Sequence, residues 1–187
     1  DCLMLYIEQA PNADAGIDQT ICETETINIS GTAAHFGQIS WSSSGDGSFA
    51  DGSSLTTSYT PGAQDIAAGN VVLCLTATGL NACAEAQDCL TVTLQQLPQS
   101  DAGSDLTICE TSVVELSGFA QHYSGLLWTT SGDGTFTDAN ILNPVYSPGT
   151  SDLQNGMAEL CLTANGEAGC ENTSDCLIAT FQPVPVV

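Results

Sequence analysis

The sequence of 187 residues contains no lysine and no arginine, although it has 22 aspartate and glutamate residues and a formal net charge of -22. Nucleic-acid phosphates are bound by lysine and arginine, so this composition excludes a nucleic-acid partner. The same absence removes the attraction of basic segments to an anionic membrane surface. No apolar run is long enough to cross a bilayer, and we expect no membrane insertion. The acidic excess favours a solvated, self-repelling surface, divalent cations as ligands, or both.

The familiar motifs of catalytic sites are missing as well. The chain has no G-x-S-x-G elbow, no H-E-x-x-H helix and no phosphate-binding glycine loop. Its two histidines, His35 and His122, are isolated from one another in the sequence, and a lone loop histidine is expected to be structural. Without lysine or arginine, no permanent side-chain charge is available to stabilise an oxyanion. We therefore expect that the chain is not an enzyme.

What the sequence does contain is an internal repeat with a period of 87 residues. The cysteines Cys22, Cys74, Cys83 and Cys89 recur as Cys109, Cys161, Cys170 and Cys176, each pair differing by 109 - 22 = 87. The same offset relates W-S-S-S-G-D-G-S-F at 41–49 to W-T-T-S-G-D-G-T-F at 128–136. So many Cys, Trp and Gly residues in register without a gap indicate two tandem copies of one domain, at 14–100 and 101–187.

The ninth cysteine extends the repeat towards the N-terminus. D-C-L at 1–3 matches D-C-L at 88–90, since 2 + 87 = 89. Residues 1–13 are therefore expected to be the last strand of a preceding repeat, with Cys2 facing a cysteine of that neighbouring repeat. Either the sequence is a window of a longer array, or this strand completes a neighbouring subunit. The window is favoured because both full repeats already have such a strand.

The residue pattern within each repeat is that of β-structure. Thr, Ser, Gly, Val, Ile and Leu dominate, and apolar residues alternate with polar ones. In the first repeat we expect strands at 18–22, 26–30, 39–43, 55–60, 71–78 and 89–95, with a short helical turn at 65–69. G-D-G at 45–47 predicts a tight hairpin with positive φ, and Trp41 before it predicts a core anchor. About seven strands per 87 residues predict a Greek-key β-sandwich.

Three motifs that both repeats share carry a resemblance to a known family. They are D-A-G-x-D-x-T-I-C-E, Y-x-P-G and L-C-L-T-A-x-G, which begin at Asp14, Tyr59 and Leu73 in the first repeat. With the W-x-x-S-G-D-G-x-F stretch, they resemble the tandem immunoglobulin-like, PKD-like repeats of secreted Bacteroidetes surface proteins, such as gliding-motility adhesins and filament proteins. The resemblance implies an all-β chain of two tandem immunoglobulin-like Greek-key β-sandwiches, plus the extra N-terminal strand, at the cell surface or outside the cell. The absence of Lys and Arg and the four cysteines per repeat depart from simpler relatives.

The cysteines are expected to form disulfides. A four-cysteine zinc site usually has close C-x-x-C pairs, and the chain has none. Leu160, Leu162 and Ala164 must face the core, so Cys161 between them faces outward, and the same alternation turns Cys176 outward on the next strand. Adjacent antiparallel strands with outward cysteines can be bridged. This predicts the pairs Cys161–Cys176 and, in the first repeat, Cys74–Cys89.

Two pairings remain open for the other cysteines. Cys22 can bond Cys83 within the repeat, and likewise Cys109 can bond Cys170. However, Cys22 should lie at one pole of the sandwich and Cys83 at the other, roughly 25 Å away. The alternative joins Cys22 to Cys170 of the following repeat, which would staple the array covalently.

Calcium is the only cofactor that the sequence suggests. Asp14, Asp18, Asp101 and Asp105 recur at the start of each repeat, and Ca²⁺ binds carboxylate and carbonyl oxygens. The alternative is that these aspartates form turns by bonding the local backbone.

The function expected from these features is structural: a repeat segment of an extracellular filament or cell-surface fibre built from disulfide-stabilised tandem domains. Its partners would be copies of itself, head to tail, or flanking repeats of a longer chain. Two alternatives are spacer repeats of a cell-surface adhesin and a carbohydrate-binding accessory module of a secreted enzyme. Closely similar repeats favour the structural function, and a sugar-binding module should expose aromatic side chains that here are expected to be buried.

Overall fold

A computed structural model describes residues 4, 7–80 and 83–184, and the chain divides into two compact units, Asp1–Gln96 and Leu97–Val187. The boundary therefore precedes the predicted one at residues 100 and 101. The reason is the short strand β10 (Gln99–Asp101), which pairs antiparallel with β13 (Phe119–Gln121) inside the second unit. Pairing of backbone groups, and not the start of the D-A-G motif, determines where the second unit begins.

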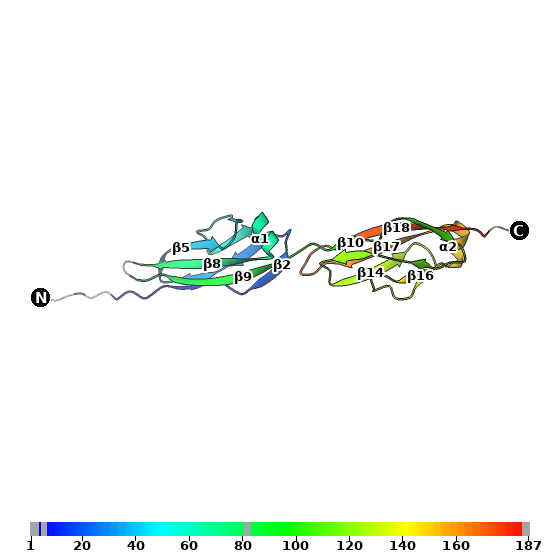
Figure 1. Cartoon of the computed structure of the whole chain (residues 1–187). Coiled ribbons are helices and arrows are strands. Elements are labelled where there is room, and N and C mark those ends of the chain that lie inside the picture. Colours follow the sequence, from blue (N-terminus) through cyan, green and yellow to red (C-terminus); the bar gives the residue numbers. More distant parts are fainter. Residues whose placement is uncertain (1–3, 5–6, 81–82, 185–187) are drawn as a thin grey trace. The chain divides into compact units, whose positions relative to one another are not determined.

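The first unit is a β-sandwich (Figure 1). Its larger sheet has the order β2-β9-β8-β5 and its smaller sheet the order β3-β7-β6, beside a short β1–β4 pair. The bounds are β1 Asn12–Asp14, β2 Gln19–Cys22, β3 Ile27–Ser30, β4 Thr32–Ala34, β5 Phe36–Ser43, β6 Ser48–Phe49, β7 Thr56–Thr60, β8 Asn70–Gly79 and β9 Ala86–Gln95. Strand β2 runs parallel to β9, whereas β9 with β8 and β8 with β5 are antiparallel. Each of the six predicted strands is present.

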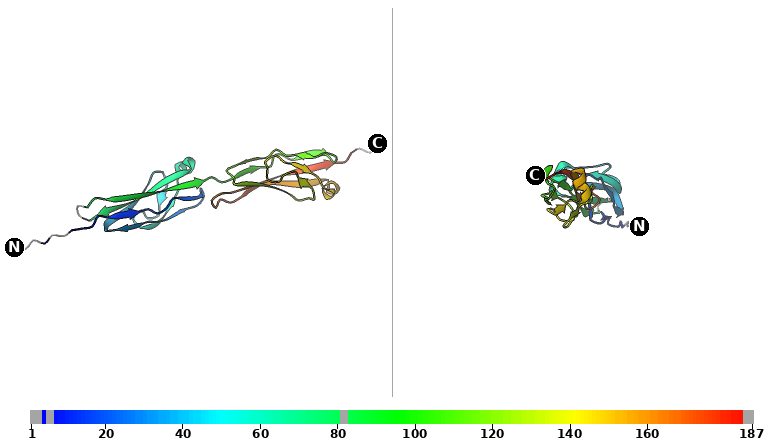
Figure 2. Two further views of the ribbon diagram at one scale, coloured as in Figure 1. Left: turned by 90° about the horizontal axis from the view of Figure 1, so that it is seen from below. Right: turned by 90° about the vertical axis from the view of Figure 1, so that its right-hand side faces the viewer.

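The second unit repeats this arrangement. Its larger sheet has the order β11-β18-β17-β14 and its smaller sheet the order β12-β16-β15. The bounds are β11 Leu106–Cys109, β12 Val114–Glu115, β14 Gly125–Thr130, β15 Thr135–Phe136, β16 Val145–Ser147, β17 Met157–Asn165 and β18 Thr173–Gln182. Each sandwich carries one short helix, α1 (Ala63–Ala68) or α2 (Thr150–Asn155), seen from further directions in Figure 2. Among the described residues, no helix has the length and apolar character needed to span a membrane.

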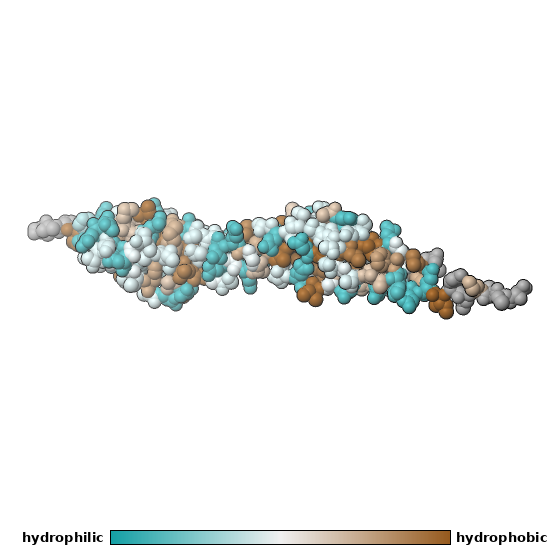
Figure 3. All heavy atoms as spheres, turned by 180° about the vertical axis from the view of Figure 1, so that it is seen from behind, coloured by the Kyte–Doolittle hydropathy of each residue, from teal (hydrophilic) through white to brown (hydrophobic). Residues whose placement is uncertain are grey.

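The core of each sandwich follows from the alternation of side chains along its strands. In β8, Val71, Leu73, Leu75 and Ala77 are all fully buried, because successive residues of a strand point to opposite faces. Strand β9 adds Leu90, Val92 and Leu94 to the same core cluster. Trp41 is 6% exposed and Trp128 is 2% exposed, which confirms them as core anchors. On the face drawn in Figure 3, hydrophobic residues form only scattered patches among neutral and hydrophilic ones.

Residues 1–3, 5 and 6 of the predicted N-terminal strand lie outside the described residues, and Cys2 is among them. Of the part that is described, Met4 and residues 7–11 have no strand structure. Asn12 and Ala13 belong to β1, which pairs with β4 of the first unit. These two residues are therefore part of the first sandwich and not of a preceding repeat.

Candidate functional site

The Gly-Asp-Gly stretch at 45–47 is a corner between two sheets and not the predicted hairpin. The strand before it, β5, pairs with β8, whereas the strand after it, β6, pairs with β7. The positive φ values among the glycines of this unit are at Gly16 and Gly69. Gly45 and Gly47 are needed for a different reason: a Cβ on Gly45 would overlap a carboxylate oxygen of Asp65, and one on Gly47 would overlap the carbonyl of Thr60.

A buried carboxylate lies under this corner. Asp65 in α1 is 2% exposed. Its Oδ2 accepts hydrogen bonds from the hydroxyl of Tyr59 at 2.8 Å and from the backbone N–H groups of Gly62 at 3.0 Å and Gly47 at 3.2 Å. One side chain thus joins the corner, strand β7 and the start of α1. Backbone N–H groups and one hydroxyl stabilise the buried Asp65 carboxylate, since the chain has no lysine or arginine that could pair with it.

Asp46, the aspartate of the corner, forms a second contact between the corner and helix α1. Asp46 Oδ1 accepts hydrogen bonds from the N–H groups of Gln64 at 3.1 Å and Asp65 at 3.3 Å. These N–H groups belong to the first turn of α1 and have no partner within the helix. A carboxylate at this end also interacts favourably with the helix dipole. Asp46 therefore stabilises the start of α1, a role that its position in a glycine-rich stretch did not reveal.

The second sandwich has the same buried cluster. Tyr146 donates to Asp152 Oδ2 at 2.6 Å, and the N–H groups of Gly149 and Asp133 donate to the same carboxylate at 2.9 and 3.2 Å. Burial, together with the hydrogen bond to Asp152, raises the pKa of Tyr146 to about 12, and burial also raises the pKa of Tyr59. Both hydroxyls therefore remain protonated donors at neutral pH. The sequence signal that could have located these clusters is the shared spacing Y-x-P-G-x-x-D at 59–65 and 146–152.

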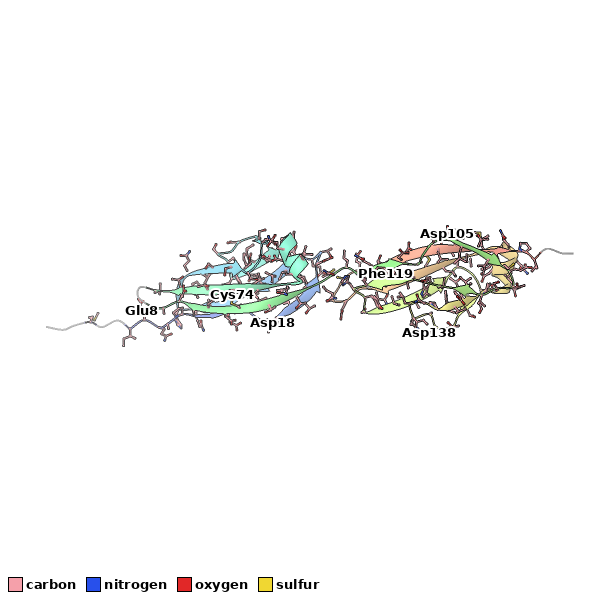
Figure 4. The ribbon with its side chains drawn as sticks, in the orientation of Figure 1. Glu8, Asp18, Cys74, Asp105, Phe119 and Asp138 are labelled. Carbon is pink, nitrogen blue, oxygen red and sulfur yellow. A yellow bond between two sulfur atoms is a disulfide. The ribbon has the colours of Figure 1, made fainter. Side chains whose placement is uncertain are left out.

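Each sandwich has one cross-strand disulfide, in agreement with the pairing predicted from alternation. Cys74 in β8 lies opposite Cys89 in β9, with the sulfurs 2.10 Å and the Cα atoms 4.0 Å apart. Cys161 and Cys176 match them in the second unit, at 2.08 and 4.0 Å. Both bridges lie on the outer sheet face, where Figure 4 labels Cys74, because the inward positions of these strands belong to the core.

Of the two pairings left open for Cys22, the one with Cys83 inside the same repeat is contradicted, and so is the expectation that Cys83 and Cys109 form disulfides. Cys22 and Cys170 are each disulfide-bonded, whereas Cys83 and Cys109 are free thiols. The parallel register places Cys22 beside Gln95, at the end of β9, while Cys83 precedes the start of β9 at Ala86. Nine residue steps separate Ala86 from Gln95, which is about 30 Å in a strand, and a disulfide needs Cα atoms within about 7 Å. The alternative pairing of Cys22 with Cys170 of the following repeat stays a prediction.

The four aspartates proposed for calcium bind backbone groups within their own units. Asp14 Oδ1 accepts the N–H of Gly16 at 2.8 Å, and Asp101 does the same with Gly103 at 2.8 Å. Asp18 accepts the N–H of Thr91 in β9 at 2.7 Å. In the second unit, Asp105 accepts the N–H of Ile178 in β18 at 2.8 Å (Figure 4). Within residues 7–80 and 83–184, no group of three or more His, Cys, Asp or Glu side chains is arranged to hold a metal ion. The contacts of Asp14 and Asp101 match the turn-forming alternative, whereas Asp18 and Asp105 bond the last strand of their sandwich, far away in the sequence. Calcium binding stays a prediction.

Two further acidic residues anchor the chain where it enters each sandwich. Asp88 Oδ2 accepts the N–H of Ala15 at 2.8 Å, and Asp175 accepts that of Ala102 at 2.8 Å. The two histidines adopt left-handed backbone conformations, with φ 58° at His35 and φ 54° at His122, and both side chains are exposed. Many of the acidic side chains therefore act as acceptors for backbone N–H groups, in a chain that has no lysine or arginine to pair with them.

Solved structures with a similar fold contain tandem domains. The N-terminal eight Ig domains of Down Syndrome Cell Adhesion Molecule match with a TM-score of 0.63 at 10% identity, over 94% of this chain and 28% of that one. The titin I-band fragment I67–I69 matches with a TM-score of 0.54 at 11% identity, over 95% and 67%. Drosophila N-cadherin EC1-4 matches with a TM-score of 0.50 at 13% identity, over 94% and 50%. The chain thus spans about half the length of the cadherin structure.

At these identities the similarity shows the fold alone. It confirms the prediction of an all-β chain with two tandem immunoglobulin-like sandwiches. No protein-family model and no curated protein sequence matches the chain. The resemblance to immunoglobulin-like repeats is therefore supported at the level of the fold, and its narrower part, the PKD-like repeats of Bacteroidetes, stays a prediction.

Proposed function

We propose that this chain is a load-bearing structural segment of an extracellular filament or cell-surface fibre. The observation that carries the proposal is the way each sandwich holds its terminal strands. After the three-residue strand β1, strand β2 runs parallel to β9, the last strand of the sandwich, so opposite pulls on the two chain ends slide β2 and β9 along one another. Their hydrogen bonds then share the load instead of opening one at a time. The Cys74–Cys89 bridge adds a covalent link between β9 and β8.

The disulfides also support a location outside the cytoplasm. Disulfides persist in oxidising compartments and on cell surfaces, and they are rare where thiols are kept reduced. A chain with a net charge of -22 stays soluble by self-repulsion, as an exported protein must before it assembles. The partners that this function requires are further sandwiches of the same kind, from flanking repeats or other copies, arranged head to tail.

The burial of both tryptophans argues against the carbohydrate-binding alternative. Trp41 and Trp128 are core residues and cannot stack on a sugar. Phe119 and Tyr123 are exposed in the second unit, but the equivalent positions of the first unit hold Thr32 and the half-buried Phe36. The two repeats therefore do not share an aromatic binding face. The adhesin-spacer alternative uses the same mechanical property as the proposed function.

The load-bearing function predicts the length released when a sandwich is pulled apart by its ends. The bridged strands enclose 15 residues per sandwich, and an extended residue spans up to about 3.6 Å, so the disulfide should withhold about 50 Å of chain per sandwich. Single-molecule force spectroscopy should use C22S/C170S as the reference protein, because Cys22 and Cys170 are also disulfide-bonded and would change the extension on reduction. The reference should lengthen by this amount per sandwich on reduction, and adding C74S/C89S to it should give the increase for the first sandwich without reductant. Equal extension in the oxidised and reduced protein would show that the bridge lies outside the load path.

Calcium binding through Asp14, Asp18, Asp101 and Asp105 is a second proposal about the same chain. Ca²⁺ at a hundredfold excess over its Kd would stabilise the folded state by about 2.7 kcal/mol, so EDTA should lower the Tm. Calorimetry with Ca²⁺, with Mg²⁺ and with EDTA measures this shift, and D14N/D101N should abolish it. The same Tm in all three buffers would contradict calcium binding, and the only role of these aspartates would then be their hydrogen bonds to the backbone.

A further inference from the structure

We propose that Cys109 of one copy of this chain forms a disulfide with Cys83 of the next copy, joining the copies head to tail. This inference rests on the proposed function, because it names the covalent link between the segments of the fibre. It starts from two positions that occur once in every sandwich. The strand-end cysteines are Cys22 and Cys109, at the ends of β2 and β11, and the loop cysteines are Cys83 and Cys170, in the last hairpin.

The two strand-end cysteines have the same backbone surroundings. The N–H of Glu25 donates to the carbonyl of Cys22 at 3.0 Å, and that of Ser112 donates to the carbonyl of Cys109 at 2.9 Å. The residue after each cysteine donates to the end of the last strand, Glu23 to Gln95 at 2.9 Å and Glu110 to Gln182 at 3.0 Å. A cysteine that can bond Cys22 would therefore meet the same backbone geometry at Cys109.

The two loop cysteines are equally alike. The N–H of Cys83 donates to Leu80 at 3.1 Å, and that of Cys170 donates to Glu167 at 2.9 Å. Both loops fold closely over a glycine, since a Cβ on Gly79 or Gly166 would collide with the backbone of the cysteine above it. The loop of each sandwich thus presents its cysteine in the same way.

Within one sandwich a strand-end cysteine and a loop cysteine lie at opposite ends of the last strand, about 30 Å apart, and cannot meet. A strand-end cysteine can bond a loop cysteine only from another sandwich. Cys22 and Cys170, one of each kind, are disulfide-bonded, whereas Cys109 and Cys83, again one of each kind, are free thiols. Cys109 is exposed and Cys83 is half-buried. The chain therefore has one free strand-end cysteine, Cys109 in the second sandwich, and one free loop cysteine, Cys83 in the first sandwich. In a head-to-tail array, the second sandwich of one copy would meet the first sandwich of the next.

The reaction is thiol–disulfide exchange with a small-molecule disulfide. The thiolate of one cysteine attacks the oxidant, releases one small thiol and forms a mixed disulfide. The second cysteine then attacks the protein sulfur and releases the second small thiol, so one disulfide is reduced for each one formed. Because the partners are different surface positions, each added copy leaves one thiol of each kind for the next copy, and repeated contacts build a fibre wherever the rotation between copies does not close a ring.

The test uses the full chain with oxidised and reduced glutathione, at high salt to screen the repulsion between acidic copies. On non-reducing gels the wild-type protein should form a ladder of multiples of 19.2 kDa that reductant removes. C83S alone and C109S alone should each lose the ladder. A mixture of these two variants, each also carrying C2S so that the cysteine outside the described residues takes no part, should give a dimer and nothing longer, since each variant keeps one of the two cysteines. Fragments from a Glu-specific protease should identify the Cys83–Cys109 link, because trypsin has no cleavage site.

Other results would overturn the inference. Dimers of C83S alone or C109S alone, as abundant as those of the mixture, would show unselective pairing. A monomeric wild-type protein with a Cys83–Cys109 bond inside one chain would exclude the link between copies. The double variant C83S/C109S separates this inference from the proposed function: if it still forms fibres by electron microscopy, the segments associate without the disulfide. Alkylation of the wild-type thiols gives the same comparison without a substitution.

Discussion

Replacing Asp65 by alanine is expected to lower the free energy of unfolding of the first sandwich by about 4 kcal/mol. The substitution removes the acceptor of the Tyr59 hydroxyl and of the Gly62 N–H, whereas the Gly47 N–H keeps the Tyr59 hydroxyl oxygen as an acceptor at 2.9 Å. Each donor left without a partner costs about 1–3 kcal/mol, so two such losses give the expected effect. A small domain has only about 5–15 kcal/mol of stability, so a large part of it depends on this one carboxylate. The equivalent change at Asp152 should act on the second sandwich.

Urea unfolding followed by tryptophan fluorescence measures this effect, because Trp41 and Trp128 each report on one sandwich. D51A is a matched control: Asp51 is exposed and accepts hydrogen bonds only from the backbone and hydroxyl of Ser53, at 2.9 and 2.6 Å. Its loss should cost less than about 1 kcal/mol, as is usual for exposed polar contacts. Y59F removes one donor and should fall between the two. If D65A costs no more than D51A, the buried cluster does not hold the corner.

Removing a cross-strand disulfide is expected to cost about 3 kcal/mol per sandwich. The bridge closes a segment of 15 residues, and a loop of this length loses about that much chain entropy in the unfolded state. The variant C74S/C89S should therefore shift the urea midpoint of the first sandwich and leave that of the second unchanged. Because Cys89 is exposed and Cys74 only half-buried, serine at these positions leaves no cavity in the core.

The matched control for this prediction is C83S, which replaces a thiol that forms no disulfide in the chain. It should leave both urea midpoints unchanged. The variant C161S/C176S should reproduce the shift in the second sandwich, whose bridge also encloses 15 residues. A C74S/C89S protein as stable as the wild type would mean that the hydrogen bonds between β8 and β9 already provide the full constraint.

The sequence by itself determined the properties that depend on local order along the chain. The 87-residue period established two copies of one domain, and alternation in β8, β9, β17 and β18 placed Cys74, Cys89, Cys161 and Cys176 on the outer face. Alternation is reliable here because the core requires one face of each strand to be apolar. The absence of lysine and arginine predicts, without any knowledge of the fold, that nucleic acid is not a partner.

Only the tertiary structure decided which strands pair and which polar groups are buried. The Gly-Asp-Gly stretch has the composition of a hairpin, but β5 and β6 join different sheets, and pairing partners far apart in the chain determine that. Asp65 resembles any helical aspartate in the sequence, and its burial depends on Tyr59 and the corner closing over it. The separation of Cys22 from Cys83 likewise arises from the parallel register of β2 and β9. The strand pairings and the contact of Asp65 with the corner join residues far apart in the chain, and local patterns alone do not determine such contacts.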